Sequence, residues 1–443
     1  MKRFMVSAMN SGAGKTVITC ALLSAMQKEG LSVHAFKCGP DYIDPMFHSQ
    51  VLGVPSKNLD LFLLGEAALK KTLFCCHADL AILEGAMGFY DGLSRTTDNS
   101  AWEIAHLTDT PVLLVLRPAG VGITLAAQIQ GLLHFRRESN IRALLLSDCR
   151  KSLAAYYTSI LEKECGIPVL GFLPPMEEAV FSSRHLGLCS PEEISDFSRR
   201  ISVLADTLQK HTDLPRLLDL AADSPSAFSA PNPIPPVCRI AVARDKAFSF
   251  LYEGSLEALY EAGAEIVFFS PLQDACPPPD IDGLYLCGGY PELFAAELAE
   301  NAGMRGNIRN LIKCGLPTVA ECGGFLYLQQ ELEDPSGKRY PMCGVLPGTG
   351  YRTDSLQHFG YQWIIPEQDS LLFRKGEKIP AHEFHYWDCT CNGSSFTSLK
   401  PGGQSWRSGF ATNTLYAAFP HLHLGGLLPL ASRFINKARA YRS

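Results

Sequence analysis

The feature that most constrains the fold is a glycine-rich loop between an apolar run and a helix-like segment near the N-terminus. Phe4–Ala8 has the character of a buried strand, and Val17–Lys28 that of an amphipathic helix, with Ser-Gly-Ala-Gly-Lys-Thr between them. In such loops backbone N–H groups bind phosphate oxygens, Lys15 can reach the outer phosphates and the Thr16 hydroxyl suits Mg²⁺. Met9 stands where the consensus has a glycine, so the loop is of the deviant form, and the alternative is an ordinary strand-to-helix turn. The predicted nucleotide-binding residues are Ser11, Gly12, Ala13, Gly14, Lys15 and Thr16.

Short β-rich runs alternate with helix-length segments in the first half of the chain, and a second series of the same kind follows. Such alternation is typical of parallel sheets covered by helices on both faces. We therefore predict an α/β fold in two domains, the first of them a P-loop doubly wound parallel sheet. The further runs interpreted as strands are Val33–Phe36, Leu80–Glu84, Val112–Leu116, Ala143–Leu146, Arg239–Ala243, Glu265–Phe269, Gly283–Cys287 and Pro317–Ala320, with a helix at Gly254–Ala262.

A segment rich in proline and serine separates the two series. It runs from Asp223 to Pro236, where prolines remove backbone donors and serines favour solvated backbone. We place the linker at residues 224–236, between a first domain at 1–223 and a second at 237–443. The total of 443 residues gives each domain enough chain to bury its own core.

Composition argues against several functional classes. Charged residues make up 19% of the chain, both signs are interspersed and the net charge is -6, so neither nucleic acid nor an anionic membrane is expected as a partner. No apolar run reaches the ~18–20 residues that span a bilayer, and the N-terminal segment does not resemble a signal peptide, so a cytoplasmic protein is expected. The 15 cysteines, an odd number scattered along the chain, indicate reduced thiols rather than disulfides or a structural metal site. No pattern assigns a role to the pair Cys389 and Cys391.

Carboxylates follow two of the predicted strands. Asp41 and Asp44 come after the second strand. Glu84 ends the third, and the glycine-rich loop after it carries Asp91. Ligands of open α/β sheets collect at the carboxyl ends of the strands, so these side chains are expected beside a metal–nucleotide complex. Singly each is more often a helix cap or turn former, but together they predict phosphoryl-transfer chemistry, with Mg²⁺ held by Thr16, Asp44 and Glu84.

In the second domain a cysteine stands between a predicted strand and a helix. A short apolar strand leads through Glu-Cys-Gly-Gly into a helical segment, so Cys322 is expected on a nucleophile elbow, its thiolate stabilised by the helix N-terminus. The N–H groups of Gly289 and Gly323 are expected to form an oxyanion hole. His421 and His423 are the candidate bases, and no acidic third member of a catalytic triad is evident next to either.

The order of these motifs resembles that of the cobyrinic acid a,c-diamide synthases and of their aerobic counterparts, which act on hydrogenobyrinic acid. So many separate blocks in one order are hard to obtain by chance, and they span nearly the whole chain. The similar blocks are Ser11–Thr16, Lys37–Pro45, Asn58–Asp60, Glu84–Gly92, Arg184–Leu188, Ala241–Phe250, Phe269–Asp274, Gly288–Glu292, Ala381–Tyr386 and His421–His423.

The resemblance implies a synthetase domain of the dethiobiotin synthetase type, followed by a class I-like glutamine amidotransferase domain. In such ligases ATP and Mg²⁺ activate a carboxylate as an acyl phosphate. Ammonia, released from glutamine by the cysteine that is here Cys322, then converts the acyl phosphate to an amide. By resemblance the substrate is cobyrinate, a corrin-type macrocycle of cobalamin biosynthesis, amidated at its c and then its a carboxylate.

The resemblance also implies roles for individual residues. Related cobyric acid synthases have a Tyr-x-His-Gly element whose histidine aligns better with His421 than with His423, so His421 is preferred as the base. Tyr42 and Ile43 fall where the family contacts the carboxylate being modified. The implied substrate-binding set is Asp41, Tyr42, Ile43, Asp44 and Asp91.

Other interpretations fit the same motifs. The macrocycle could be hydrogenobyrinate or nickel-sirohydrochlorin, amidated by the same chemistry. In a different class, the chain could be a nucleotide-dependent switch protein with a relic amidotransferase domain. Both a monomer and a homodimer are compatible with the sequence.

Overall fold

The computed structural model describes residues 1–179, 191–225, 228 and 234–442, without the side chains of residues 191–194, and the block Arg184–Leu188 lies outside the described residues. The chain forms two compact units. The first is Met1–Leu61 with Glu66–Ala230, and the second is Phe62–Gly65 with Pro231–Ser443. The main division therefore falls within the predicted linker, whose own bounds stay a prediction.

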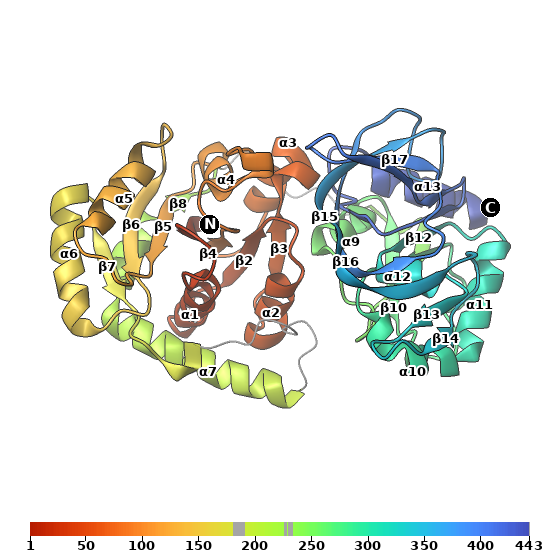
Figure 1. The fold of residues 1–443 in the computed structure, drawn as a ribbon, viewed down its shortest axis with the longest axis horizontal. Helices are drawn as coiled ribbons and strands as arrows, with labels where there is room; N and C mark the ends of the chain where they lie inside the picture. The colour runs from red at the N-terminus through yellow and green to blue at the C-terminus, as the bar shows by residue number, and fades with distance from the viewer. Residues whose placement is uncertain (180–190, 226–227, 229–233, 443) are drawn as a thin grey trace. The chain divides into compact units, whose positions relative to one another are not determined.

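The first unit is built on a sheet with strand order β3-β2-β4-β1-β5-β6-β7, parallel at every pairing (Figure 1). A short strand, β8, joins β1 in the antiparallel direction. All five residues of β5 are buried, which explains why its sequence is continuously apolar rather than alternating. The strands are β1 Lys2–Ala8, β2 Val33–Cys38, β3 Ser56–Leu59, β4 Leu80–Glu84, β5 Val112–Leu116, β6 Ile141–Leu146, β7 Val169–Phe172 and β8 Ala222–Asp223.

Helices α1, α7 and α8 share one core with this sheet. Ile18 of α1, Leu204 of α7 and Leu217 of α8 belong to the same buried cluster as Val6 and Val115 of the strands. The helices of the unit are α1 Lys15–Lys28, α2 Ile43–Leu52, α3 Leu61–Phe74, α4 Ala101–Leu107, α5 Thr124–His134, α6 Lys151–Cys165, α7 Pro191–His211 and α8 Leu214–Leu220, with the 3-10 turns η1 Leu93–Arg95 and η2 Glu177–Ala179.

Helix α3 is divided between the two units. Gly65, with φ 71°, interrupts its helical geometry, and Phe62–Gly65 belongs to the second unit. The ring of Phe62 lies 4.7 Å from that of Tyr361 and 5.2 Å from that of Trp363, measured between centroids. A short piece of the N-terminal sequence is thus part of the aromatic packing of the C-terminal unit.

The second unit contains the predicted parallel sheet, with order β10-β9-β11-β12-β20-β19. Its pairings are parallel except for that of β19 with β20. The strands are β9 Cys238–Ala243, β10 Ala264–Phe269, β11 Gly283–Leu286, β12 Thr318–Glu321, β19 Phe410–Ala411 and β20 Leu415–Ala418. The helices are α9 Glu253–Glu261, α10 Ala295–Glu300, α11 Ala302–Lys313, α12 Gly323–Tyr327 and α13 Leu430–Arg442, with the 3-10 turn η4 Pro291–Phe294.

A second sheet of this unit, mostly antiparallel, has no counterpart in the sequence-based strand assignment. Its order is β14-β13-β15-β16-β21, with β17 and β18 paired beside β15. It matters for function because β21 carries His421, which pairs with His382 of β16. The strands are β13 Glu331–Glu333, β14 Arg339–Pro341, β15 Thr349–Pro366, β16 Ile379–Cys389, β17 Phe396–Leu399, β18 Ser405–Ser408 and β21 His421–Leu422.

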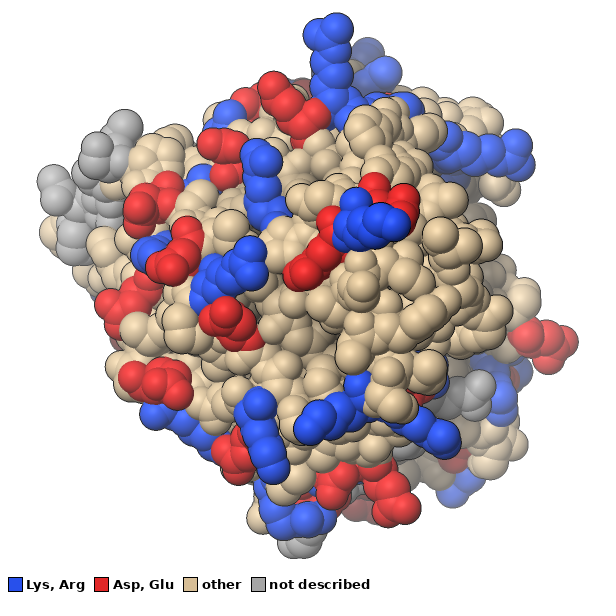
Figure 2. Space-filling view, turned by 90° about the vertical axis from the view of Figure 1, so that its left-hand side faces the viewer, with Lys and Arg blue, Asp and Glu red and all other residues tan. Residues whose placement is uncertain are grey.

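The face drawn in Figure 2 carries basic and acidic side chains interspersed over uncharged surface. In the part of the chain that the structure describes, no helix is both long and apolar enough to cross a membrane. The cysteines in that part are free thiols.

Candidate active sites

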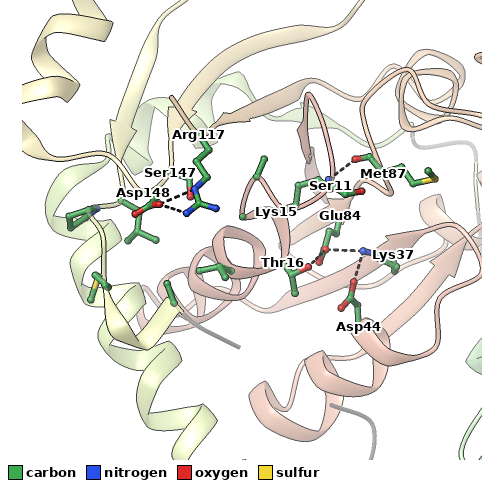
Figure 3. A pocket seen from close by; sticks show the side chains of 18 residues that line it. Ser11, Lys15, Thr16, Lys37, Asp44, Glu84, Met87, Arg117, Ser147 and Asp148 are labelled. Atoms are coloured by element: carbon green, nitrogen blue, oxygen red, sulfur yellow. Dashed lines mark hydrogen bonds and ion pairs between the residues drawn. The ribbon is translucent and has the colours of Figure 1, made fainter. Parts of the chain in front are cut away.

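The glycine-rich loop of the first unit lines a cavity of about 570 Å³ (Figure 3). Gly12 and Gly14 have φ of 78° and 96°, which L side chains rarely adopt. A Cβ on Gly14 would also lie 2.6 Å from the Ser147 hydroxyl oxygen. The backbone therefore turns tightly into α1, which begins at Lys15, two residues before the predicted start. Ser11–Thr16, the predicted phosphate-binding residues, all line this cavity.

Lys15 is held by backbone carbonyl groups. Its Nζ donates to the carbonyl oxygen of Asn10 at 3.1 Å and to that of Met87. Burial and the neighbouring Lys37 lower the pKa of Lys15. A phosphate would supply anionic acceptors in place of these neutral carbonyl groups.

A charged network occupies one end of the cavity, where Figure 3 shows Lys37 between two carboxylates. The Thr16 hydroxyl donates to Oε1 of Glu84 at 2.6 Å. Lys37 Nζ donates to the same oxygen at 2.8 Å and also forms an ion pair with Asp44. Oε2 of Glu84 lies 3.5 Å from Nε2 of His48. Thr16 and Glu84 thus meet beside the glycine-rich loop, and their role as magnesium ligands stays a prediction.

The two carboxylates of this network differ in their electrostatics. Burial raises the pKa of Glu84, but Lys37 and His48 outweigh this effect and leave the pKa below its usual value. Burial and the nearby Glu84 raise the pKa of Asp44. Glu84 is therefore the stronger candidate for a ligand that is ionised at rest.

The oxygen donors of this end fit Mg²⁺. A hydroxyl and a carboxylate are hard ligands, and Mg²⁺ commonly takes one or two carboxylates together with substrate phosphates and water. Lys37 engages both carboxylates, but Glu84 also meets the Thr16 hydroxyl and has a lowered pKa, whereas the pKa of Asp44 is raised. Thr16 and Glu84 are therefore the more direct candidates. Within the described ranges no group of three or more His, Cys, Asp or Glu side chains is placed to hold a metal on its own.

The residues expected to bind the substrate lie at two loops. Asp41 Oδ1 accepts a hydrogen bond from the N–H of Ile43 at 2.8 Å, and Tyr42 is the N-cap residue of α2. Asp91 accepts a hydrogen bond from the N–H of Gly88 at 2.9 Å and is exposed. Asp41 and Asp91 thus stabilise turns, the commoner role of a single carboxylate at such a position. Of the substrate-binding set, only Asp44 lines the cavity.

Sequence reasoning missed several residues of this cavity. Lys37 was given no role, although it lies one residue before the end of β2, opposite Glu84 in the parallel register with β4. At the opposite end of the cavity, Arg117 donates to Asp148 Oδ2 at 2.9 Å, beside Ser147 (Figure 3). Arg117 directly follows β5, and Ser147 directly follows β6. Their positions at the carboxyl ends of strands are the signal that could have indicated them.

Cys322 stands on a strained turn between β12 and α12. Its φ of 46° and ψ of -101° are unusual for a side chain other than glycine, and its N–H donates to the Ala418 carbonyl at 2.8 Å. A Cβ on Gly324 would lie 2.2 Å from the Leu286 carbonyl oxygen, and one on Gly323 would lie 2.9 Å from the Gly289 nitrogen. The small residues after the cysteine are thus required by close packing, and the two predicted oxyanion-hole glycines are neighbours.

The thiol of Cys322 is not stabilised as a thiolate at rest, contrary to the expectation from its place before a helix. Burial raises the pKa of Cys322 well above its usual range, and the carboxylates of Glu292 and Glu383 raise it further. The N–H of Gly323 acts in the opposite direction. Helix α12 has only five residues, so its dipole is weak compared with the cost of a buried charge. Ionisation of this thiol therefore needs a base.

The two candidate bases lie in different surroundings. His421 lies beside the loop that carries Gly289, one of the two predicted oxyanion-hole residues. A Cβ on the preceding residue, Gly288, would lie 2.4 Å from Cε1 of His421. His423 instead stacks on Tyr252, with ring centroids 5.2 Å apart, and its Nδ1 accepts the N–H of Gly425. Burial lowers the pKa of His421 to about 3 and that of His423 to about 4, so both are neutral at rest. The position beside the loop favours His421.

An acidic residue does lie close to His421, although the sequence next to the histidines shows none. Oε2 of Glu321 is 3.8 Å from Nδ1 of His421. Glu321 comes from β12, 100 residues earlier, in the mostly parallel sheet, whereas His421 lies on β21 of the mostly antiparallel sheet. A search limited to the neighbourhood of the histidine could not find it.

Comparisons with known proteins agree with the two-domain organisation. The model of the CobQ/CobB/MinD/ParA nucleotide binding domain matches residues 4–186, and that of the CobB/CobQ-like glutamine amidotransferase domain matches residues 239–426. A solved structure of PurLQS from Thermotoga maritima is 16% identical, covers 47% of this chain and 98% of its own, and has a TM-score of 0.30, too low to define a shared fold.

Curated relatives match over the full length. A cobyrinate a,c-diamide synthase of Caldanaerobacter subterraneus subsp. tengcongensis is 35% identical over 99% of this chain and 98% of its own. Proteins of the same name from Clostridium tetani and Fusobacterium nucleatum subsp. nucleatum are each 36% identical, over 99% and 96% of this chain and 100% and 98% of theirs. The chain therefore belongs to the cobyrinate a,c-diamide synthase family, whose members are glutamine-dependent amidotransferase ligases.

Proposed function

We propose that this chain amidates the c and then the a carboxylate of cobyrinate, using ATP and glutamine, in cobalamin biosynthesis. The observation that carries the proposal is that one chain, similar to its relatives over its full length, has both a cavity lined by a glycine-rich loop and a cysteine on a strained turn. A switch protein with a relic amidotransferase domain would have no need to keep Cys322 strained and packed between glycines.

In the synthetase site the chain's own residues bind and neutralise phosphate. The N–H groups of the loop hold the phosphates, and Lys15 turns from its carbonyl partners to the outer phosphate oxygens. Mg²⁺ held by Thr16 and Glu84, with Asp44 nearby, would add positive charge at the transferred phosphoryl group. A substrate carboxylate oxygen bonds to the γ-phosphorus as the bond to ADP breaks, giving an acyl phosphate. Ammonia then attacks the acyl carbon and phosphate leaves, giving the amide.

In the amidotransferase site His421 takes the proton of the Cys322 thiol as the sulfur attacks the side-chain carbonyl of glutamine. Proton transfer and attack belong together, because burial makes a free thiolate costly. The N–H groups of Gly289 and Gly323 stabilise the oxyanion. His421 returns the proton to the leaving ammonia, and water hydrolyses the thioester to glutamate.

The test is to incubate the purified chain with ATP, Mg²⁺, glutamine and each macrocycle in turn, and to count amidations by mass. Cobyrinate is expected to gain one and then two amides, with one glutamate and one ADP formed for each. A product only from hydrogenobyrinate or nickel-sirohydrochlorin would retain the chemistry and change the substrate. Absence of any amide and of glutamate release would support the switch protein.

A further inference from the structure

The amidotransferase site holds a buried carboxylate that the mechanism above does not use. Glu321 ends β12 directly before Cys322, and it is 1% exposed. Its Oε2 lies 3.8 Å from Nδ1 of His421. Burying a carboxyl group is costly unless specific partners hold it, so its partners indicate its role.

Two donors fix the orientation of this carboxylate. The N–H of Leu422 donates to Oε1 at 3.0 Å, and the hydroxyl of Tyr285 donates to Oε2 at 3.1 Å. Leu422 follows His421 in β21, so the strand that presents the imidazole also holds the carboxylate. A carboxylate oxygen accepts two hydrogen bonds, and Oε2 therefore keeps capacity for a second donor beside the tyrosine.

We propose that Glu321 is a positioning residue for glutamine hydrolysis. It accepts a hydrogen bond from Nδ1–H of His421, fixes the tautomer in which Nε2 can take the Cys322 proton, and stabilises the imidazolium that forms. The distance of 3.8 Å exceeds a hydrogen bond, and such contacts are commonly long in a resting site and tighten as charge develops. This inference rests on the proposed function.

The experiment compares Glu321→Gln and Glu321→Asp with the wild-type chain in two assays, glutamate release from glutamine and amidation supported by ammonia. Glu321→Gln is expected to lower kcat for glutamate release by about 10²–10⁴-fold, the scale seen when an orienting acid is replaced by its amide. KM for glutamine and the ammonia-supported rate should stay within about threefold, because the residue acts through His421 and not on the substrate. Glu321→Asp should restore part of kcat.

The matched control is Glu377→Gln, which removes another carboxylate of the same unit. Glu377 forms an ion pair with Arg433 at 2.6 Å and has no part in the proposed mechanism. It should lower stability and leave the kinetics of glutamate release unchanged.

Three results would overturn the assignment of Glu321. They are an unchanged kcat in Glu321→Gln, a rise in KM at constant kcat, and a parallel loss of the ammonia-supported reaction. If the wild-type chain itself releases no glutamate, the proposed function fails first and this inference fails with it. If the wild-type chain releases glutamate and Glu321→Gln releases it with the same kcat, this inference alone fails.

Discussion

The two sites handle charge in opposite ways. At the phosphate loop, Lys37 and Glu84 are charged at rest, and the pKa of Glu84 lies below its usual value although burial alone would raise it. Around Cys322, burial raises the pKa of the thiol and lowers that of His421, so the proposed nucleophile and its proposed base are both neutral. The first site is prepared for a polyanion that arrives charged. The second creates charge only during the reaction, which protects a buried thiol from premature ionisation.

The largest expected effect comes from removing the nucleophile. Cys322→Ser should lower glutamine-supported amidation by about 10³-fold or more and leave ammonia-supported amidation intact, because only the second site needs the thiol. Both rates are measured by mass of the product. Cys276→Ser, at an exposed thiol of the same unit, is the control and should change neither rate. Loss of both reactions in Cys322→Ser would contradict the separation of the two sites.

Removing the cation at the first site should destabilise the resting protein. Lys37→Met leaves Asp44 and Glu84 buried without their shared cation and is expected to cost about 3–5 kcal/mol, as for a broken buried ion pair. Lys28→Met, which breaks an exposed pair with Asp206, should cost less than about 1 kcal/mol. Denaturant unfolding of the two variants provides the comparison. An equal loss of unfolding free energy in the two variants would show that the buried ion pairs of the first site do not stabilise the protein.

A smaller effect is expected from the shape of the loop. Gly14→Ala forces an L side chain to φ 96° and places its Cβ against Ser147, which should weaken ATP binding by about 10–100-fold. Adding Ser147→Ala to Gly14→Ala removes the contact with the hydroxyl but not the backbone strain. ATP affinity should therefore recover only in part. Gly30→Ala has a similar φ of 83° but open space around it, and it should lower stability without changing ATP affinity. Calorimetric titration with ATP measures all three.

The smallest effect concerns pH at the second site. Burial raises the pKa of Glu321 to about 8, so this carboxyl is protonated below that pH and ionised above it. Glutamate release should therefore rise about tenfold between about pH 7 and pH 9, because only the ionised form orients His421. Glu321→Gln should give a flat profile over this range.

Other titratable groups lie near Glu321, and the pH experiment needs a control variant for any that titrates in the same range. Burial raises the pKa values of the neighbouring thiols and hydroxyls, which belong to Tyr285, Cys287, Cys322 and Tyr416. Burial lowers the pKa of His421. Burial also raises the pKa of Glu292, beside Cys322, to about 8. A rise that persists in Glu321→Gln and disappears in Glu292→Gln would assign the titration to Glu292.

Local sequence patterns predicted those parts of the molecule that local physics determines. Apolar runs such as Val112–Leu116 are strands because both faces are covered, and the turn before Lys15 follows from its glycines. The antiparallel sheet was not predicted, since β15 is long, irregularly paired with β16 and lacks a simple alternation of burial.

Contacts between distant strands could not be obtained from local patterns. Lys37 meets Glu84 through the register of β2 and β4, and Glu321 meets His421 across β12 and β21. The ionisation of Cys322 was predicted from its local helix, whereas the burial that controls it comes from the whole domain. Charge balance at both sites is thus a property of tertiary structure.

The divided helix α3 has a consequence for cutting this protein into its two halves. Because Phe62–Gly65 belongs to the second unit, the chain passes between the units at three points rather than one. A protease that cuts only in the proline-rich segment would leave Phe62 packed on Tyr361 and Trp363, and a buried phenylalanine contributes about 1.5–3 kcal/mol. That contribution alone does not hold two fragments together, because even a Kd of about 1 mM requires about 4 kcal/mol. An N-terminal fragment produced alone, ending at the linker, would expose an aromatic side chain whose binding place lies in the missing half.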